Sequence, residues 1–299
     1  MMVIMWRSQL MRRIVHLAPA NPFTLALKMA SSMKIFGRIF SLAVVILTWA
    51  GEIPNQPPIQ VYYTGNMGIY IKVPGAGFLI DGLHDYYGPN YLHPDESLLH
   101  QIMMHLPPFD QVITLLNTHV HDDHYDSELT ISYLRKHQTA TLLAPQQVLD
   151  SLTQDLGGAK EIKSQCVPLT SQHLIAPSIV IRSGPIRHTY QQRHHWVENY
   201  FIALQVAGRT IIHLGDSEAS ADAFDEVPIF KNVDLVIVPF WFLLSDEGLE
   251  ILEQKFQSKR IMVTHISPLI DADMLDSMKT ILPGIIICTE LNQTLEIQN

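Results

Sequence analysis

Short apolar stretches separated by turn-forming residues stand at the start of the chain's central region. Residues 59–64, 68–73 and 77–81 are rich in Ile, Val, Tyr and Phe, and Gly65-Asn66 and Pro74-Gly75 interrupt them. Such runs predict β-strands, because β-branched and aromatic side chains pack well on a pleated surface while Gly, Asn and Pro favour turns. We therefore expect an antiparallel three-stranded meander here.

Further along, apolar runs of strand length alternate with longer segments of helical periodicity. Helices are expected over residues 95–105, 127–137, 146–156, 246–256 and 271–279, and strands over 112–116, 141–144, 162–167, 178–182, 200–206, 210–214, 235–238, 261–264 and 285–288. This alternation predicts helices packed on the faces of a sheet. The chain is therefore expected to be an α/β protein.

Residues 1–51 differ from the rest of the chain because they hold six basic residues and no acidic one. An apolar run over 39–50 follows Lys34 and Arg38, which is the layout of a secretory signal peptide. The run is shorter than the roughly 20 residues that span a bilayer, but Trp49 stands where a small residue is preferred, so a membrane anchor is the alternative. The linker is expected at 52–58, and the domain at 59–299. The predicted location is periplasmic or secreted, or membrane-anchored with the domain outside the cytoplasm.

Composition narrows the class of partner. Residues 52–299 carry 14 Lys and Arg against 29 Asp and Glu, and such an acidic domain would repel phosphate backbones. No nucleic-acid partner is expected, and contact with a membrane is expected only through the N-terminal segment if that segment is uncleaved. The cysteines, Cys166 and Cys288, could pair in an exported protein or remain separate thiols.

Three histidines and two aspartates follow the apolar run 112–116 within the stretch Thr118-His119-Val120-His121-Asp122-Asp123-His124. On extended backbone His119 and His121 point the same way and can reach one cation, while Asp123 and His124 can be aimed at a second point nearby. Imidazole nitrogen and carboxylate oxygen suit divalent metals such as zinc. A histidine-rich surface loop is the alternative, but this density of ligand types at a strand end favours a metal site.

Further candidate ligands follow other predicted strands. His188 comes after residues 178–182, Asp216 lies in Leu214-Gly215-Asp216, and His265 directly follows residues 261–264. His194 or His195 could take the place of His188, which we prefer because it lies nearer its strand end.

Taken together, His119 to His124, His188, Gly215-Asp216 and His265 resemble the ligand pattern of the metallo-β-lactamase-fold hydrolase superfamily. The resemblance extends over roughly residues 59–299. It implies a four-layer αββα sandwich of two mixed sheets, with helices on the outer faces and metals at one edge.

The resemblance also implies the roles of the candidate residues. The first metal would be held by His119, His121 and His188, the second by Asp123, His124 and His265, with Asp216 between them. Asp123 and Asp216 are the expected catalytic residues, and the cofactors are two divalent ions, zinc with manganese or iron as alternatives. A metal-bridging hydroxide would be the nucleophile.

Departures from the family pattern bear on the substrate. Asp216 stands where β-lactam-cleaving members often use Cys, and residues 239–244 lack the paired histidines of DNA-uptake-type relatives. The chain is therefore placed nearer the broad lactonase and phosphodiesterase group. We expect His194, His195 and Trp241 to contact the substrate, and the irregular segment 83–94 to cover the site.

These observations predict an exported, dinuclear metal-dependent hydrolase that cleaves an ester-like bond, such as a lactone or phosphodiester, of a small-molecule or lipid-like substrate. The alternatives are an iron-dependent oxidoreductase of the same fold and a metal-containing binding protein. The ligand types do not separate zinc from iron, and the sequence does not specify the substrate.

Overall fold

The computed structural model of the protein describes residues 58–155 and 160–298. The predicted leader at 1–51 and all but the last residue of the linker at 52–58 lie outside this part, so both stay predictions. Among the helices that are described, none combines the length and the apolar character needed to cross a membrane.

The first sheet has seven strands in the order β14-β1-β2-β3-β4-β5-β6. Their bounds are β1 Ile59–Gly65, β2 Gly68–Val73, β3 Ala76–Ile80, β4 Val112–Leu116, β5 Thr141–Ala144, β6 Cys166–Pro168 and β14 Thr294–Ile297. Neighbouring strands are antiparallel from β14 to β3, which confirms the expected meander, and parallel from β3 to β6.

The second sheet also has seven strands, in the order β13-β12-β11-β10-β9-β8-β7. They are β7 Gln172–Ala176, β8 Ile179–Pro185, β9 Tyr200–Val206, β10 Arg209–His213, β11 Leu235–Pro239, β12 Ile261–Thr264 and β13 Ile286–Ile287. As in the first sheet, antiparallel pairing gives way to parallel pairing, here at β10.

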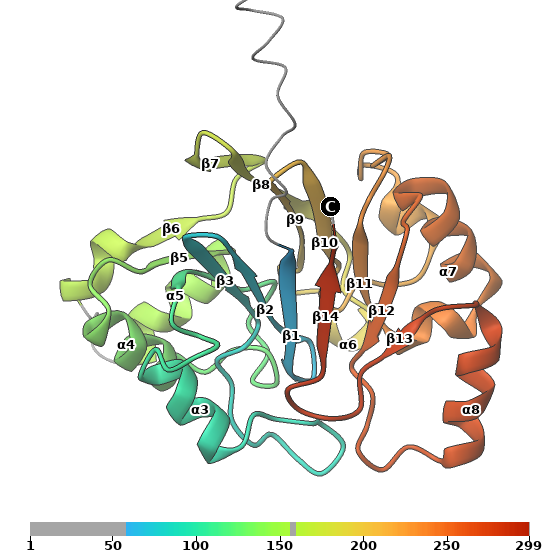
Figure 1. Cartoon of the computed structure of the whole chain (residues 1–299), viewed down its shortest axis with the longest axis horizontal. Coiled ribbons are helices and arrows are strands. Elements are labelled where there is room, and N and C mark those ends of the chain that lie inside the picture. The colour runs from blue at the N-terminus through green and yellow to red at the C-terminus, as the bar shows by residue number, and fades with distance from the viewer. Residues whose placement is uncertain (1–57, 156–159, 299) are drawn as a thin grey trace, which may run out of the picture. The chain divides into compact units, whose positions relative to one another are not determined.

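Helices cover the outer faces of both sheets, so the expected αββα sandwich is confirmed. Figure 1 shows one set of helices beside the first sheet and another beside the second. The former are α3 Glu96–Met103, α4 Ser127–Lys136 and α5 Gln146–Asp155, and the latter α7 Asp246–Ile251 and α8 Ala272–Ile281. One buried hydrophobic cluster joins residues of both sheets. A second lies between the first sheet and its helices, and a third between the second sheet and its helices.

Several predicted elements need correction. Residues 162–167 were expected to form a strand, but the structure has a 3-10 turn, η1 Lys160–Gln165, before the short β6. The amide of Gln165 explains the turn, because it donates to the carbonyls of Leu134, His137 and Ala140 and so ties η1 to the end of α4. The helix expected at 246–256 is α-helical only to Ile251 and continues as a π-helical turn, Leu252–Phe256.

Two strands lie outside the predicted set, β7 and β14. Both are short: β7 has only exposed and half-buried positions, and β14 has one buried position, at Ile297. Neither therefore stands out as an apolar run. The two cysteines are free thiols, one half-buried in β6 and the other buried after β13.

Candidate active site

The predicted metal ligands all follow carboxyl ends of strands. Residues 117–124 come after β4, His188 after β8, Asp216 after β10, and His265 directly after β12. The carboxyl ends of parallel strands meet at one edge of a sheet, where ligand sites commonly form. The fold therefore gathers residues that lie far apart in the sequence.

Three of these histidines form a first cluster. His119, His121 and His188 place one nitrogen each within 4.8 Å of the others. Their ring centroids are 4.8 to 4.9 Å apart, and each pair of rings is close to perpendicular. The short distances between their nitrogens mean that one ion could contact all three rings.

The second cluster contains two carboxylates and two imidazoles. Asp123, His124, Asp216 and His265 also place their potential ligand atoms within 4.8 Å of one another. His265 Nε2 lies 3.4 Å from Asp123 Oδ2 and 3.3 Å from Asp216 Oδ2.

Asp216 is the residue that connects the clusters. Its Oδ2 lies 3.8 Å from Nε2 of His188 in the first cluster and 3.3 Å from Nε2 of His265 in the second. Its Oδ1 lies 3.2 Å from His124 Nε2. A carboxylate in this position can bind two adjacent cations at once.

Several buried polar atoms of the site have no hydrogen-bond partner among the residues that the structure describes. They are Nε2 of His119, His188 and His265 and Oδ1 of Asp216. Buried polar groups are nearly always paired, and an unpaired one costs free energy unless an ion or water satisfies it. The residues present therefore fit a group of two divalent metals, because imidazole nitrogens and carboxylates are the donors such ions bind.

In two of the ligand histidines, His124 and His188, Nδ1 contacts an oxygen atom outside the clusters, which leaves Nε2 facing the other ligands. Nδ1 of His124 lies 3.0 Å from Asp81 Oδ2, and Nδ1 of His188 lies 2.6 Å from the carbonyl oxygen of Thr189. A ring that donates its Nδ1 proton to such an acceptor presents an unprotonated Nε2, the form in which a metal binds.

Electrostatics differ between the clusters. Burial, together with the neighbouring rings, lowers the pKa of His119 well below its usual value and that of His121 to about 4. Burial also opposes a charge on His265, but the carboxylates of Asp216 and Asp123 outweigh it and raise the pKa to about 9. The first cluster is therefore neutral at pH 7, whereas a metal entering the second must displace protons.

The aspartates of the second cluster are ionised. Although burial favours the neutral acid, the neighbouring imidazoles of His124 and His265 lower the pKa of Asp123 to about 2. The same two rings, with His265 the larger influence, hold the pKa of Asp216 well below its usual range against the effect of burial. Both carboxylates can thus act as ligands throughout the neutral range.

The backbone of the site adopts conformations that are uncommon for residues with side chains. Asp81 has φ +47° and His265 has φ +59°, in the left-handed region, which such residues rarely visit except where the surrounding structure holds them. The amide of His265 donates to the carbonyl oxygen of Asn66, 3.0 Å away. Tertiary contacts therefore fix the direction of this ligand.

The predicted substrate contacts differ in position. The ring of His194, in the helical turn α6 (Gln191–His194), lies 4.7 Å from that of His121 and 4.9 Å from that of His188. Trp241 packs 5.0 Å from His265 and donates from Nε1 to the carbonyl oxygen of Ser217. His195 is exposed and has no ring contact with a predicted metal ligand among those described. It lines a cavity that His188 also lines. The first two side chains border the ligand clusters.

The segment expected to cover the site lies beside it. The ring of Tyr91 packs edge-on at 5.6 Å from His265, and Tyr87 packs at 5.1 Å from Tyr91. The ring of His265 therefore packs against two aromatic rings, those of Tyr91 and Trp241.

Sequence reasoning missed the residues that orient the ligands. Asp81 accepts hydrogen bonds from the backbone N–H and the hydroxyl of Thr118 as well as contacting His124. Asn66 donates to the carboxylate of Asp123 at 2.9 Å. For Asp81 the sequence did offer a signal, because it follows a fully apolar strand and a buried Asp needs partners. For Asn66 the turn between two strands was a sufficient explanation, so the sequence held no further signal.

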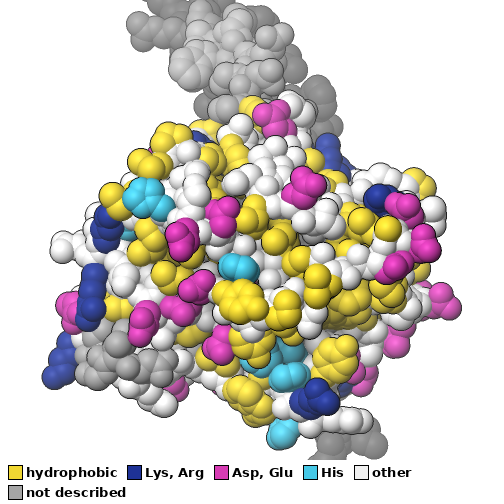
Figure 2. Space-filling model, turned by 90° about the horizontal axis from the view of Figure 1, so that it is seen from below, with side chains coloured by type: hydrophobic (Ala, Val, Ile, Leu, Met, Phe, Trp, Pro, Cys, Tyr) yellow, Lys and Arg dark blue, Asp and Glu magenta, His cyan; other side chains and the backbone are white. Residues whose placement is uncertain are grey.

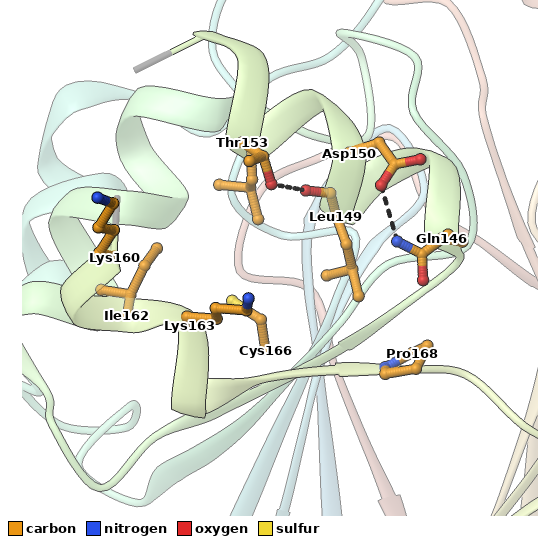
Figure 3. Close-up of a pocket in the computed structure, with 10 residues that line it drawn as sticks. Gln146, Leu149, Asp150, Thr153, Lys160, Ile162, Lys163, Cys166 and Pro168 are labelled. Atoms are coloured by element: carbon orange, nitrogen blue, oxygen red, sulfur yellow. Dashed lines mark hydrogen bonds between the residues drawn. The ribbon is translucent and has the colours of Figure 1, made fainter. Parts of the chain in front are cut away.

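A cavity of about 510 Å³ lies elsewhere, between α5 and the turn η1. Figure 3 shows Lys160, Lys163 and Cys166 on one side of it and Thr153 and Asp150 on the other. None of the residues known to line it is a predicted metal ligand, so we do not assign it to the metal centre.

Two mixed sheets with a histidine and aspartate centre at one edge define a protein of the metallo-β-lactamase fold, a class of mostly metal-dependent hydrolases. The family model described as the beta-lactamase superfamily domain matches residues 78–284, and the chain belongs to this superfamily.

Solved structures agree with this assignment. The metallo-beta-lactamase fold protein YhfI from Bacillus subtilis is 14% identical, with a TM-score of 0.55 over 81% of this chain and 100% of that one. The metallo hydrolase Igni18 from Ignicoccus hospitalis is 17% identical, with a TM-score of 0.55 over 81% and 99%. CmlA, a diiron beta-hydroxylase from Streptomyces venezuelae, is 16% identical, with a TM-score of 0.51 over 81% and 54%. At these identities the similarity establishes the fold. The search among curated proteins gave no match.

Proposed function

We propose that this protein is a dinuclear metal-dependent hydrolase that cleaves an ester-like bond. The observation that carries the proposal is the position of Asp216, whose carboxylate lies within 4 Å of imidazole nitrogens from both ligand clusters. His119, His121 and His188 would hold one ion, Asp123, His124 and His265 the other, and Asp216 would contact both.

Two divalent ions at this centre would polarise the scissile carbonyl or phosphoryl group and make water a stronger nucleophile. The chain's own residues prepare the centre for such a reaction. Asp81 and the carbonyl of Thr189 hold His124 and His188 so that Nε2 faces inward. Asp123 is ionised at neutral pH, so its carboxylate can serve as a ligand and can accept a hydrogen bond that orients the attacking water.

The proposal includes zinc as the native metal and a small-molecule or lipid-like substrate such as a lactone or phosphodiester. Asp216 in place of a cysteine and the acidic domain support this choice over β-lactams and nucleic acids. His194 and Trp241, which border the two clusters, are the proposed substrate contacts.

Metal analysis and a substrate screen test the proposal. Purified protein should contain about two divalent ions per chain, and a chelator should abolish turnover that added zinc restores. The screen would compare phosphodiesters, lactones, thioesters and β-lactams, with Asp216→Ala as the inactive control. A folded protein that takes up no metal would exclude this function.

An iron-dependent oxidoreductase is the second candidate. The structural similarity to CmlA, described as a diiron hydroxylase, supports it, because imidazole and carboxylate ligands serve iron as well as zinc. Iron content and a visible absorption spectrum would distinguish the two functions. A colourless, zinc-containing protein would exclude the second.

Export remains part of the proposal, on the evidence of the basic and apolar pattern in residues 1–51. N-terminal sequencing of protein recovered outside the cytoplasm would show whether cleavage occurs near residue 50. Recovery of the intact chain in the membrane fraction would instead support an anchor, and recovery only from the cytoplasm would contradict export.

A further inference from the structure

A pocket of about 430 Å³ adjoins the second ligand cluster. His265 and Trp241 form part of its wall, so the pocket is continuous with the proposed metal centre. The remaining wall comes from Asn90 and Tyr91, from Tyr190, from the 3-10 turn η3 (Phe240–Leu244), and from residues 266–274. Its polar members are Asn90, Ser267 and Asp271, and the other residues named are hydrophobic or aromatic.

The outer part of this pocket is apolar and exposed. Leu269 and Tyr190 are 68% and 71% exposed, and Met274, in the first turn of α8, is 46% exposed. Phe240, Ile266 and Ile270 complete the apolar lining. Figure 2 shows a face of the molecule on which histidine side chains lie next to hydrophobic ones. Apolar side chains that surround a pocket opening mark a surface that gains free energy when a ligand covers it.

The pocket beside the first cluster has the opposite character. Its volume is about 580 Å³, and most of its lining is polar: His121, three carboxylates (Asp122, Asp150 and Glu198), Ser151, and the amides of Gln147 and Gln154. Tyr87, Val120 and Trp196 also line it. A hydrocarbon placed there would strip water from carboxylates and amides without replacing their hydrogen bonds. The two sides of the centre are therefore suited to different parts of a substrate.

We propose that the pocket beside His265 binds an alkyl or acyl chain of the substrate, while the reacting group lies at the metal centre and the polar portion extends toward His121. The proposal rests on the proposed function and narrows its substrate to an amphiphile that carries such a chain. Leu269 and Met274 would determine the preference for chain length, because they line the outer part of the pocket.

Alkyl hydroxamates provide a test that needs no knowledge of the substrate. The hydroxamate group binds divalent metals, and its alkyl chain can be lengthened from acetohydroxamate to decanohydroxamate. Isothermal titration of the zinc-loaded protein should show affinity rising by up to about fourfold for each added methylene that leaves water. The rise should stop once the chain exceeds the pocket.

Substitutions in the pocket test where the alkyl chain of the hydroxamate binds. The double variant Leu269→Ser, Met274→Ser should flatten the dependence on chain length and leave acetohydroxamate affinity unchanged. Leu174→Ser is the matched control, because Leu174 is also 68% exposed but lies in β7, away from the pocket. It should keep the full dependence.

The outcomes separate the two proposals. Binding of acetohydroxamate without any gain for longer chains would overturn the apolar subsite and leave the metal centre standing. A gain that the double variant does not reduce would also overturn it. Failure of every hydroxamate to bind would contradict the metal-dependent function, and the subsite with it. If the double variant instead abolishes a dimer seen by light scattering, the surface serves self-association and the proposal is wrong.

Discussion

At the scale of single residues, Asp81 supports the predicted metal ligands from behind. It is fully buried, and its two oxygens contact His124 and accept two hydrogen bonds from Thr118. Thr118 Oγ1 in turn lies 3.0 Å from Nδ1 of His119. One carboxylate thereby influences a histidine in each cluster without contacting the centre itself.

Replacement of Asp81 by Asn should weaken zinc binding. The amide keeps the size of the side chain but removes a charged acceptor from His124 Nδ1, and loss of such partners typically reduces metal affinity about 10- to 100-fold. Competition with a chromophoric chelator would measure the change.

Asp110→Asn provides the control for this experiment. Asp110 also carries an ion pair, with Lys72, but its side chain is 39% exposed and lies outside the site. Circular dichroism should show both variants folded. If Asp81→Asn binds zinc as tightly as the unaltered protein, Asp81 does not orient His124.

At the scale of elements, the turns that end the strands place the ligands. Gly215 follows β10 with φ +55°, and a Cβ at this position would come within 2.5 Å of Asn199 Oδ1 and 2.9 Å of Thr118. Asn199 Oδ1 accepts from the backbone N–H of Asp216 at 3.3 Å. The turn thus needs glycine both for its conformation and for the close approach of the neighbouring chain.

Gly215→Ala should reduce metal content and thermal stability, because the added methyl group would push Asp216 and Thr118 apart. Gly208→Ala is the matched comparison: Gly208 also has a positive φ, +73°, but a Cβ there would meet nothing within 4 Å. Both variants carry backbone strain. We expect only Gly215→Ala to lose metal in elemental analysis, and equal metal contents would contradict the expected crowding.

The sequence predicts some elements and site residues better than others. The parallel strands and the ligands at their ends were predictable, because apolar runs followed by His or Asp are a local signal. Asp81 and Asn66 were not assigned a role, since their importance arises from contacts with residues 37 to 57 positions away. The strand β14 was missed because its pairing with β1 joins the two ends of the domain.

At the scale of the whole molecule, the buried histidines control how stability depends on pH. Burial lowers the pKa of one group of rings, with His84 and His121 at about 4, and carboxylates raise the pKa of another, with His265 at about 9. The lowered group is His84, His119, His121, His188 and His213, and the raised group is His124 and His265.

The metal-free protein should therefore be most stable at about pH 7, slightly above the ordinary histidine pKa of about 6.5, because more of these rings have a lowered pKa than a raised one. Below it the unfolded chain binds more protons than the native one, through the lowered group, and stability falls as pH decreases toward 4. Above it the native chain binds more protons, through the raised group, and stability falls as pH rises toward 9.

Urea unfolding of chelator-treated protein at pH 5, 7 and 8.5 would test this dependence. The zinc-loaded protein is the comparison, because His124 and His265 would then be neutral ligands and the decline from pH 7 to 8.5 should disappear. A metal-free protein whose stability rises steadily across this range would contradict the protonated second cluster.

The pairing of β14 with β1 has a consequence for how the chain is made. During synthesis β1, β2 and β3 emerge before the other described strands, but the edge of β1 that pairs with β14 stays open until Thr294–Ile297 has left the ribosome. Contacts between such distant segments form slowly because a long loop must close first. A chain that stops before Thr294 would leave this strand edge unpaired and open to pairing with another molecule.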